Sequence, residues 1–159
     1  METKQGSFCW LELGTTNRDA ARTFYASLFG WEANDIPMGP GMSYTLFRLG
    51  GKDVSGAYDL MADQLAARVP PHWMPYIKVD SADASASKAI RLGAKQILAP
   101  SDIPHVGRFA VIQDVTGAMI SIFQTGEHQG MQTFGAVGAL CWADLNTPDP
   151  ARAAQFYGD

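Results

Sequence analysis

The sequence contains little cysteine, few charged residues and no long apolar run, and each scarcity excludes a class of protein. Two cysteines, Cys9 and Cys141, are too few for a disulfide scaffold and too far apart for a metal-binding motif. Charged residues make up 18% of the 159 residues and hydrophobic residues 47%, which excludes a disordered chain or a coiled coil. No stretch approaches the roughly 18 apolar residues of a membrane-spanning helix. The composition predicts one globular domain, or one domain and a remnant of another.

Basic residues are also scarce. Twelve Lys and Arg against 16 Asp and Glu give a net charge of −4, and no basic run could neutralise several phosphates. Nucleic acid is therefore not an expected partner, and neither is a membrane. The N-terminal residues 1–6 are polar with no apolar segment behind them, which predicts a cytoplasmic protein.

An internal repeat divides the chain. Residues 6–25 align with residues 138–157 at an offset of 132, and eight of the 20 positions are identical. Cys9 and Cys141 are among them, which favours two small apolar positions over a redox pair. We therefore expect a complete domain over 6–126, a linker over 127–137 and the truncated start of a second domain over 138–159.

The repeat unit is predicted to be a strand followed by a helix. Residues 8–14 alternate like a strand that has two different faces. Asn17 has the short polar side chain that caps a helix, and Gly30 is the expected stop. In the second copy Asp149 is the cap and Pro150 occupies the first helical position. That copy therefore amounts to a strand and a partial helix.

A fainter copy of the unit lies in the middle of the chain. Residues 73–79 alternate as a strand, Ser81 can cap, and an Ala-rich helix over 84–92 is closed by Gly93. The other predicted strands are 42–49 and 53–58 after the first helix, and 95–98, 108–114 and 118–124 after the second. A strand and a helix followed by further strands thus occur twice.

These segments resemble the vicinal oxygen chelate superfamily, which includes glyoxalase I, extradiol dioxygenases, and fosfomycin- and bleomycin-resistance proteins. The resemblance rests on Phe24-Tyr25 with Leu28-Phe29-Gly30-Trp31, on 76–80 before the Ala-rich helix, and on 107–111 with 114–118. It implies an α+β fold of paired βαβββ modules whose curved sheets enclose a cleft. The repeated Cys-Trp segment indicates a resemblance to the subgroup whose members carry two such domains in tandem.

The resemblance also implies where a metal enzyme of this superfamily would keep its ligands. Those positions carry Trp10 on the first strand, Met74 on the fifth and Ser121 on the last. An indole, a thioether and a hydroxyl are not normal ligands for the divalent ions that this superfamily uses. A displaced site of Glu12, Asp59 and His72 is the less favoured alternative, because His72 follows two prolines, where an exposed loop is expected. No cofactor is predicted, and a divalent metal stays an alternative.

Strand alternation predicts the residues that line the cleft. If the face of the first strand that holds the superfamily's ligand points inward, the wall is aromatic and thioether-rich with a few polar groups. The candidate ligand-binding residues are Trp10, Glu12, Tyr44, Arg48, Met74, Tyr76, Lys78, Met119, Ser121 and Phe123. Glu12 is the most informative of them, as an ion-pair partner of Lys78 or Arg48 or as a carboxyl beside Trp10. An ordinary core between sheets, and an exposed Glu12, are the competing interpretations.

Three functions remain open at this point. The favoured one is a bleomycin-resistance-like domain that binds a small organic molecule without a metal. The second is a lyase or dioxygenase in which a divalent ion polarises the substrate. The third is a scaffold domain of a tandem protein. Exposed sheet edges also make a homodimer an expected assembly.

Overall fold

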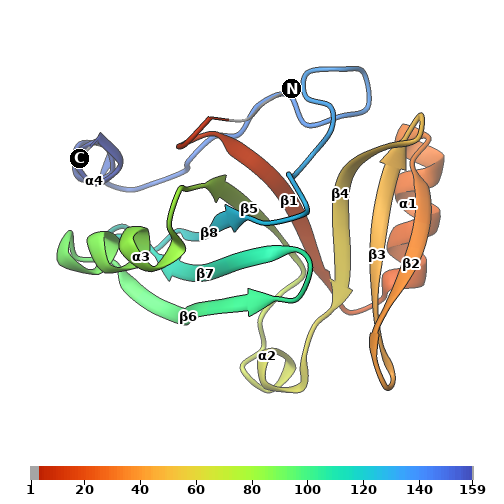
Figure 1. Cartoon of the computed structure of the whole chain (residues 1–159), viewed down its shortest axis with the longest axis horizontal. Helices are drawn as coiled ribbons and strands as arrows, with labels where there is room; N and C mark the ends of the chain where they lie inside the picture. Colours follow the sequence, from red (N-terminus) through yellow and green to blue (C-terminus); the bar gives the residue numbers. More distant parts are fainter. Residues whose placement is uncertain (1–3, 159) are drawn as a thin grey trace. The chain divides into compact units, whose positions relative to one another are not determined.

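The computed structural model describes residues 4–158 and contains two βαβββ modules (Figure 1). The first module comprises β1 (Phe8–Thr15), α1 (Arg18–Phe29), β2 (Glu32–Gly39), β3 (Met42–Leu49) and β4 (Lys52–Asp59). The second comprises β5 (His72–Lys78), α3 (Ala82–Arg91), β6 (Lys95–Ile103), β7 (Gly107–Gln113) and β8 (Met119–Thr125). Two further helices are α2 (Ala62–Ala66) and α4 (Pro150–Gly158). The predicted α+β class and the repeated module are confirmed.

The described chain divides into two compact units. The first unit contains residues 10–74 and 131–142, and its strand order is β2-β3-β4-β1. The second unit contains 75–130 and 143–158 with the short N-terminal segment, and its strand order is β5-β8-β7-β6. In each module the first strand pairs in parallel with the last strand, and the other pairings are antiparallel. The two modules therefore share one topology.

Local capping explains where the helices begin. The Asn17 side chain accepts a hydrogen bond from the Ala20 N–H, and Ser81 accepts one from the Ala84 N–H. Asp149 caps α4 in the same way through the Arg152 N–H at 3.0 Å. All three caps are therefore where the sequence predicts them, because an N-cap needs only a short polar side chain three residues before its donor.

The core of the first unit lies between α1 and one face of its strands. Leu13, Trp31, Phe47, Val54 and Ala57 form the buried cluster, and Tyr25 from α1 packs against it. The Tyr25 ring centroid lies 5.4 Å from that of Trp31 and 6.0 Å from that of Phe47. Because side chains alternate along β1, Leu13 points beneath α1 and its neighbours point to the opposite face of the strand.

The core of the second unit consists mainly of smaller side chains than the core of the first unit. Val79, Ala86, Ala110 and Ile122 form one cluster, and Ala89, Ala94, Ile112 and Phe156 form another. Phe156 belongs to α4, so the partial helix of the second repeat copy packs against the module formed by 75–130. This packing stabilises a helix that would be marginal by itself.

The segment between β8 and α4 is anchored at its start and irregular at its end. The Gln132 N–H donates to the Asp53 carbonyl at 2.8 Å, and the Trp31 indole N–H donates to the Gly138 carbonyl at 2.7 Å. Residues 141–148 form no strand, in contrast to their repeat partner β1. Within 4–158 no helix is long and apolar enough to cross a membrane.

Candidate functional site

A cluster of polar and aromatic side chains lies on the face of the first module opposite α1. Trp10, Glu12 and Gly14 alternate along β1 and therefore share that face. The parallel register sets Glu12 beside Gly56 and Gly14 beside Tyr58 of β4. The strands thus bring a carboxylate and aromatic side chains together on the side that the helix does not cover.

Tyr44 of β3 connects the members of this cluster. The Trp10 indole N–H donates to the Tyr44 hydroxyl at 2.9 Å, and the hydroxyl in turn donates to the Glu12 carboxylate. Burial raises the pKa of Tyr44 well above its usual value, and the negative charge of Glu12 raises it further. Tyr44 is therefore a neutral hydroxyl at physiological pH, held between a donor and an anion.

Two glycines make room for this arrangement. A Cβ atom at Gly56 would overlap the Tyr44 phenol, so the ring can cross β4 only where a side chain is missing. A Cβ atom at Gly14 would lie 2.9 Å from the Tyr58 hydroxyl and 3.0 Å from Cε1 of His72. Neither contact is compatible with a larger residue unless its neighbours shift.

Tyr58 and His72 complete the cluster at the far end of β1. The Gln64 side chain of α2 donates to the Tyr58 hydroxyl at 3.0 Å. Burial raises the pKa of Tyr58; the bond from Gln64 opposes this shift and the charge of Glu12 adds to it. His72 Nδ1 lies 2.9 Å from the Pro70 carbonyl, which can only accept, so this contact favours a proton on Nδ1 and leaves Nε2 as the basic ring atom.

The structure does not bring together all the residues of the displaced metal site. Asp59 lies one register step beyond Tyr58, opposite Thr15, and therefore points to the other face of the sheet. There its carboxylate accepts from Nε of Arg18 at 2.9 Å. Glu12 and His72 face the cluster, but Asp59 is held on the helix side by Arg18.

The residues in place do not fit a divalent ion. The three ligand positions implied by the superfamily carry Trp10, Met74 and Ser121. Across the described part of the chain, no group of three or more His, Cys, Asp or Glu is placed to hold a metal.

The predicted lining residues of the second module form a separate aromatic group. The Tyr76 ring stacks on Phe109 with centroids 6.3 Å apart and meets the edge of Phe123 at 6.1 Å. Ser121, which pairs with Tyr76 across the strands, is fully buried and donates to the Ala110 carbonyl at 3.2 Å. Met119 is partly exposed at the start of β8. Tyr76, Ser121 and Phe123 are therefore packed as a core, and the hydroxyl of Ser121 is already hydrogen-bonded.

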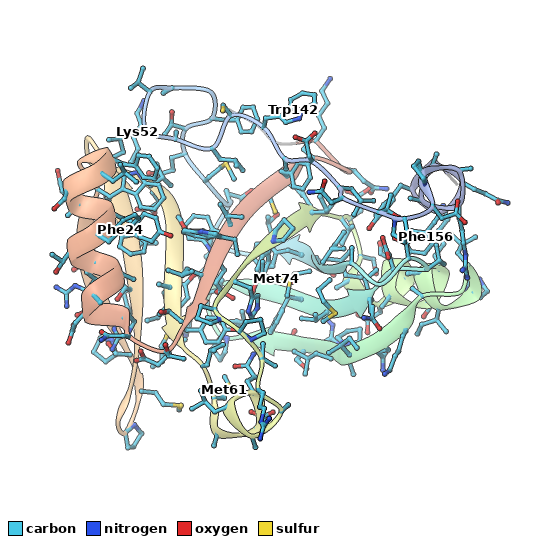
Figure 2. The ribbon with its side chains drawn as sticks, turned by 180° about the vertical axis from the view of Figure 1, so that it is seen from behind. Phe24, Lys52, Met61, Met74, Trp142 and Phe156 are labelled. Atoms are coloured by element: carbon cyan, nitrogen blue, oxygen red, sulfur yellow. The ribbon has the colours of Figure 1, made fainter. Side chains whose placement is uncertain are left out.

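Arg48, Met74 and Lys78 occupy different surroundings. Arg48 Nε donates to the Asp53 carboxylate at 2.8 Å, at an irregularity in the β3–β4 pairing. Met74, labelled in Figure 2, is buried within β5. Lys78 exchanges backbone hydrogen bonds with the N-terminal segment, and its charge lowers the pKa of Cys9, opposing the rise that burial causes. Arg48 is thus bound to Asp53, the partner that the sequence did not predict.

Sequence reasoning missed Tyr58, Gln64, Gly14 and Gly56. Tyr58 could have been found, since it lies one alternation step past Gly56 on a predicted strand. The glycines gave no signal, because the need for an empty position arises only from the Tyr44 ring on another strand.

The chain is related in sequence to longer actinobacterial proteins. It is 37% identical over 157 residues to a protein of Mycobacterium tuberculosis that bears the name glyoxylase CFP32. The aligned region covers 98% of this chain and 60% of the mycobacterial protein. It is 30% identical over 162 residues to the anthracycline biosynthesis protein DnrV of Streptomyces peucetius, at 96% and 59% coverage. The chain therefore spans about 60% of the length of these relatives. No family model matches the sequence.

Solved structures share the fold at low sequence identity. The hypothetical protein BH1468 of Bacillus halodurans superposes with a TM-score of 0.61 and 12% identity, over 79% of this chain and 98% of that one. Methylmalonyl-CoA epimerase of M. tuberculosis gives 0.57 and 13%, over 79% and 93%. The Mn(II)-bound glyoxalase of Novosphingobium aromaticivorans gives 0.55 and 16%, over 90% and 43%. At such identities the likeness concerns the fold alone.

Proposed function

From the premise that this chain has the vicinal oxygen chelate fold and glyoxylase-type relatives, as its sequence motifs indicated, we propose that it binds a small organic molecule. The site that we assign to this ligand is the face of the first module that carries Trp10, Glu12, Tyr44, Tyr58 and His72. The observation that carries the proposal is the Trp10–Tyr44–Glu12 hydrogen-bond chain, held on the sheet face opposite the α1 core.

The chemistry of the cluster indicates the class of ligand. A carboxylate has about four lone-pair positions, so Glu12 can accept a ligand donor in addition to the Tyr44 hydroxyl. Trp10 is buried, whereas the Tyr58 ring is only partly buried and offers an apolar surface against which a planar group can pack. We therefore expect a compact, partly aromatic molecule that carries a hydroxyl or amino donor. DnrV is named for the biosynthesis of anthracyclines, which suits such a ligand.

A metal-dependent lyase or dioxygenase is the less favoured function. Arg18 holds Asp59 away from Glu12, and the superfamily's ligand positions carry side chains that do not suit a divalent ion. The division into a domain over 6–126 and the start of a second domain over 138–159 is likewise part of the proposal, as are a cytoplasmic location and a homodimer through the exposed strands β2 and β6.

The proposal is tested with a library of small phenols and aromatic amines, screened by thermal shift with and without chelator. A binder of the native state raises the unfolding midpoint, and we expect the rise to survive chelation. Glu12→Gln should weaken binding of the selected compound at least about tenfold, which corresponds to the loss of one charge-assisted hydrogen bond. The matched control is Glu32→Gln, because Glu32 is exposed on β2.

Two further readouts separate the site from a general effect on folding. Tyr44→Phe removes the hydroxyl that links Trp10 to Glu12. It should weaken binding of the compound, while the far-UV circular dichroism spectrum stays native. Trp10→Phe should abolish ligand-induced quenching of tryptophan fluorescence. The proposal is wrong if no compound binds, if Glu12→Gln binds as tightly as the native chain, or if chelation removes binding.

A further inference from the structure

Helix α1 carries an apolar patch on its outer surface. Phe24 is 57% exposed, Leu28 56% and Phe29 41%. Phe24 and Leu28 lie one helical turn apart and so form a continuous surface, which we call the α1 patch; Figure 2 labels Phe24 on the helix. Single exposed apolar residues are ordinary, but two large ones side by side on one helix indicate a contact surface. Phe29 lies apart from them, because its ring packs against Tyr25 and Trp31.

The other copy of the repeat shows how the phenylalanine equivalent to Phe24 is used. Phe24 aligns with Phe156 at the offset of 132. In α4, Phe156 is only 9% exposed. Phe156 packs on a surface that we call the α3 surface, formed by Ala89, Leu92, Ala94, Ile112 and Val115. In the second copy of the repeat, the phenylalanine therefore packs against the second module.

We propose that the α1 patch docks on the counterpart of the α3 surface in a second glyoxalase-like domain, the one that residues 138–159 begin. The α3 surface of the first domain is covered by α4, which would be the first helix of the second domain. The corresponding surface of the second domain is then the one left for α1. The two contacts would be equivalent, as in an interface with two-fold symmetry.

The length of the relatives agrees with this arrangement. The matched 157 residues are 60% of the mycobacterial protein, which leaves roughly 105 residues unmatched. Together with a segment such as 138–159, that is about the length of the domain over 6–126. This inference concerns α1 and α4 only, and does not rest on the ligand site proposed above.

The test uses this chain with its α3 surface uncovered. Phe156→Asp places a charge in the cluster and should release α4, so the α1 patch of a second copy can occupy the surface. We expect this variant to self-associate in sedimentation equilibrium at concentrations up to about 1 mM, at least tenfold more tightly than the native chain. Tandem domains joined by a short linker meet at millimolar effective concentration, so a contact undetectable at about 1 mM would not hold them together.

A second substitution identifies the surface involved. Phe24→Asp added to Phe156→Asp should return association to the native level. Val137→Asp added to Phe156→Asp should leave it unchanged, since Val137 is 99% exposed and lies outside the α1 patch. If Phe156→Asp loses the native circular dichroism spectrum, Phe156→Ala takes its place. Absence of association, or association that persists after Phe24→Asp, would overturn the proposal.

Discussion

Cys9 and Cys141 occupy equivalent positions of the repeat but differ in their surroundings. Cys9 is fully buried on β1, whereas Cys141 is exposed in the irregular segment. Burial raises the pKa of the Cys9 thiol to about 12, against the opposing charge of Lys78. The two positions thus share an amino acid but differ in reactivity, because Cys9 lies buried in β1 and Cys141 lies exposed in the irregular segment.

We predict that one thiol per native chain reacts with a disulfide reagent at pH 8. The thiolate is the attacking species, and the raised pKa leaves Cys9 almost entirely protonated at this pH. Cys141 should react rapidly, and both thiols should react in urea. The control is Cys141→Ser, whose native form should be nearly inert. Rapid reaction of two thiols in the native chain would contradict the buried position of Cys9.

Alternation along β1 correctly predicts that Trp10 and Glu12 share a face, because a strand's two faces follow from its period alone. It does not predict which residue of β4 stands beside them. That depends on the register between strands, which sets Tyr58 on the site face and turns Asp59 toward Arg18. The same limit applies to Arg48, which follows an irregularity in the β3–β4 pairing.

At the scale of elements, helices are predicted better than edge strands. The caps of α1, α3 and α4 are local signals, each readable within a few residues. β2 was missed because Glu32–Gly39 lacks a regular alternation of apolar and polar residues, is mostly exposed and contains Pro37, so the evidence for it is its pairing with β3. α2 is one short turn of helix, below the length that periodicity can reveal.

Helix α4 is held by apolar packing and by a hydrogen bond. Phe156 fills the cluster against α3, and the Tyr157 hydroxyl donates to the Asp114 carboxylate at 2.8 Å. Burial acts to raise the pKa of Asp114, but hydrogen bonds from Tyr157, Thr116 and Ala118 outweigh it and hold the pKa below its usual value. Burial, and then the bond to Asp114, raise the pKa of Tyr157.

These shifts predict a pH window for the docking of α4. A lowered carboxyl pKa stabilises the folded state above about pH 4, and this contribution is lost as pH falls through the folded value. A raised phenol pKa stabilises it below about pH 10, and this contribution is lost as pH rises through the folded value. We expect Tyr157→Phe to lower the free energy of unfolding at pH 7, measured in urea.

The pH series supplies the control for that prediction. The difference between native and Tyr157→Phe chains should shrink toward zero below pH 4, because protonated Asp114 gains less from the phenol. Thr116 and Ala118 still donate to Asp114 in the variant, so the hairpin turn should survive. A difference that stays constant from pH 7 to pH 2 would show that the hydrogen bond does not stabilise α4.

At the scale of the whole chain, the second repeat copy is split between the two units. Residues 138–142 of this copy belong to the first unit, where the Gly138 carbonyl accepts from Trp31, and residues 143–158 belong to the second through α4. The copy of β1 forms no strand, although it retains the Cys-Trp pair. β1 pairs in parallel with β4, and the second copy has no strand at the corresponding place within 4–158. The alternating pattern alone therefore does not make residues 141–148 a strand.

This division predicts where a protease cuts first. Residues 141–148 have no regular structure. Within them Trp142 is 73% exposed and Leu145 is 41% exposed. We expect limiting chymotrypsin to cleave after these two residues before any site within 8–125, because cleavage needs a locally extended backbone. Mass spectrometry of the first products would identify the bond. Phe156→Ala should accelerate the cut, since α4 then holds the segment less firmly, whereas Val137→Ala should not. First cleavage within either module would show that the boundary between the repeat copies is not the weakest part of the chain.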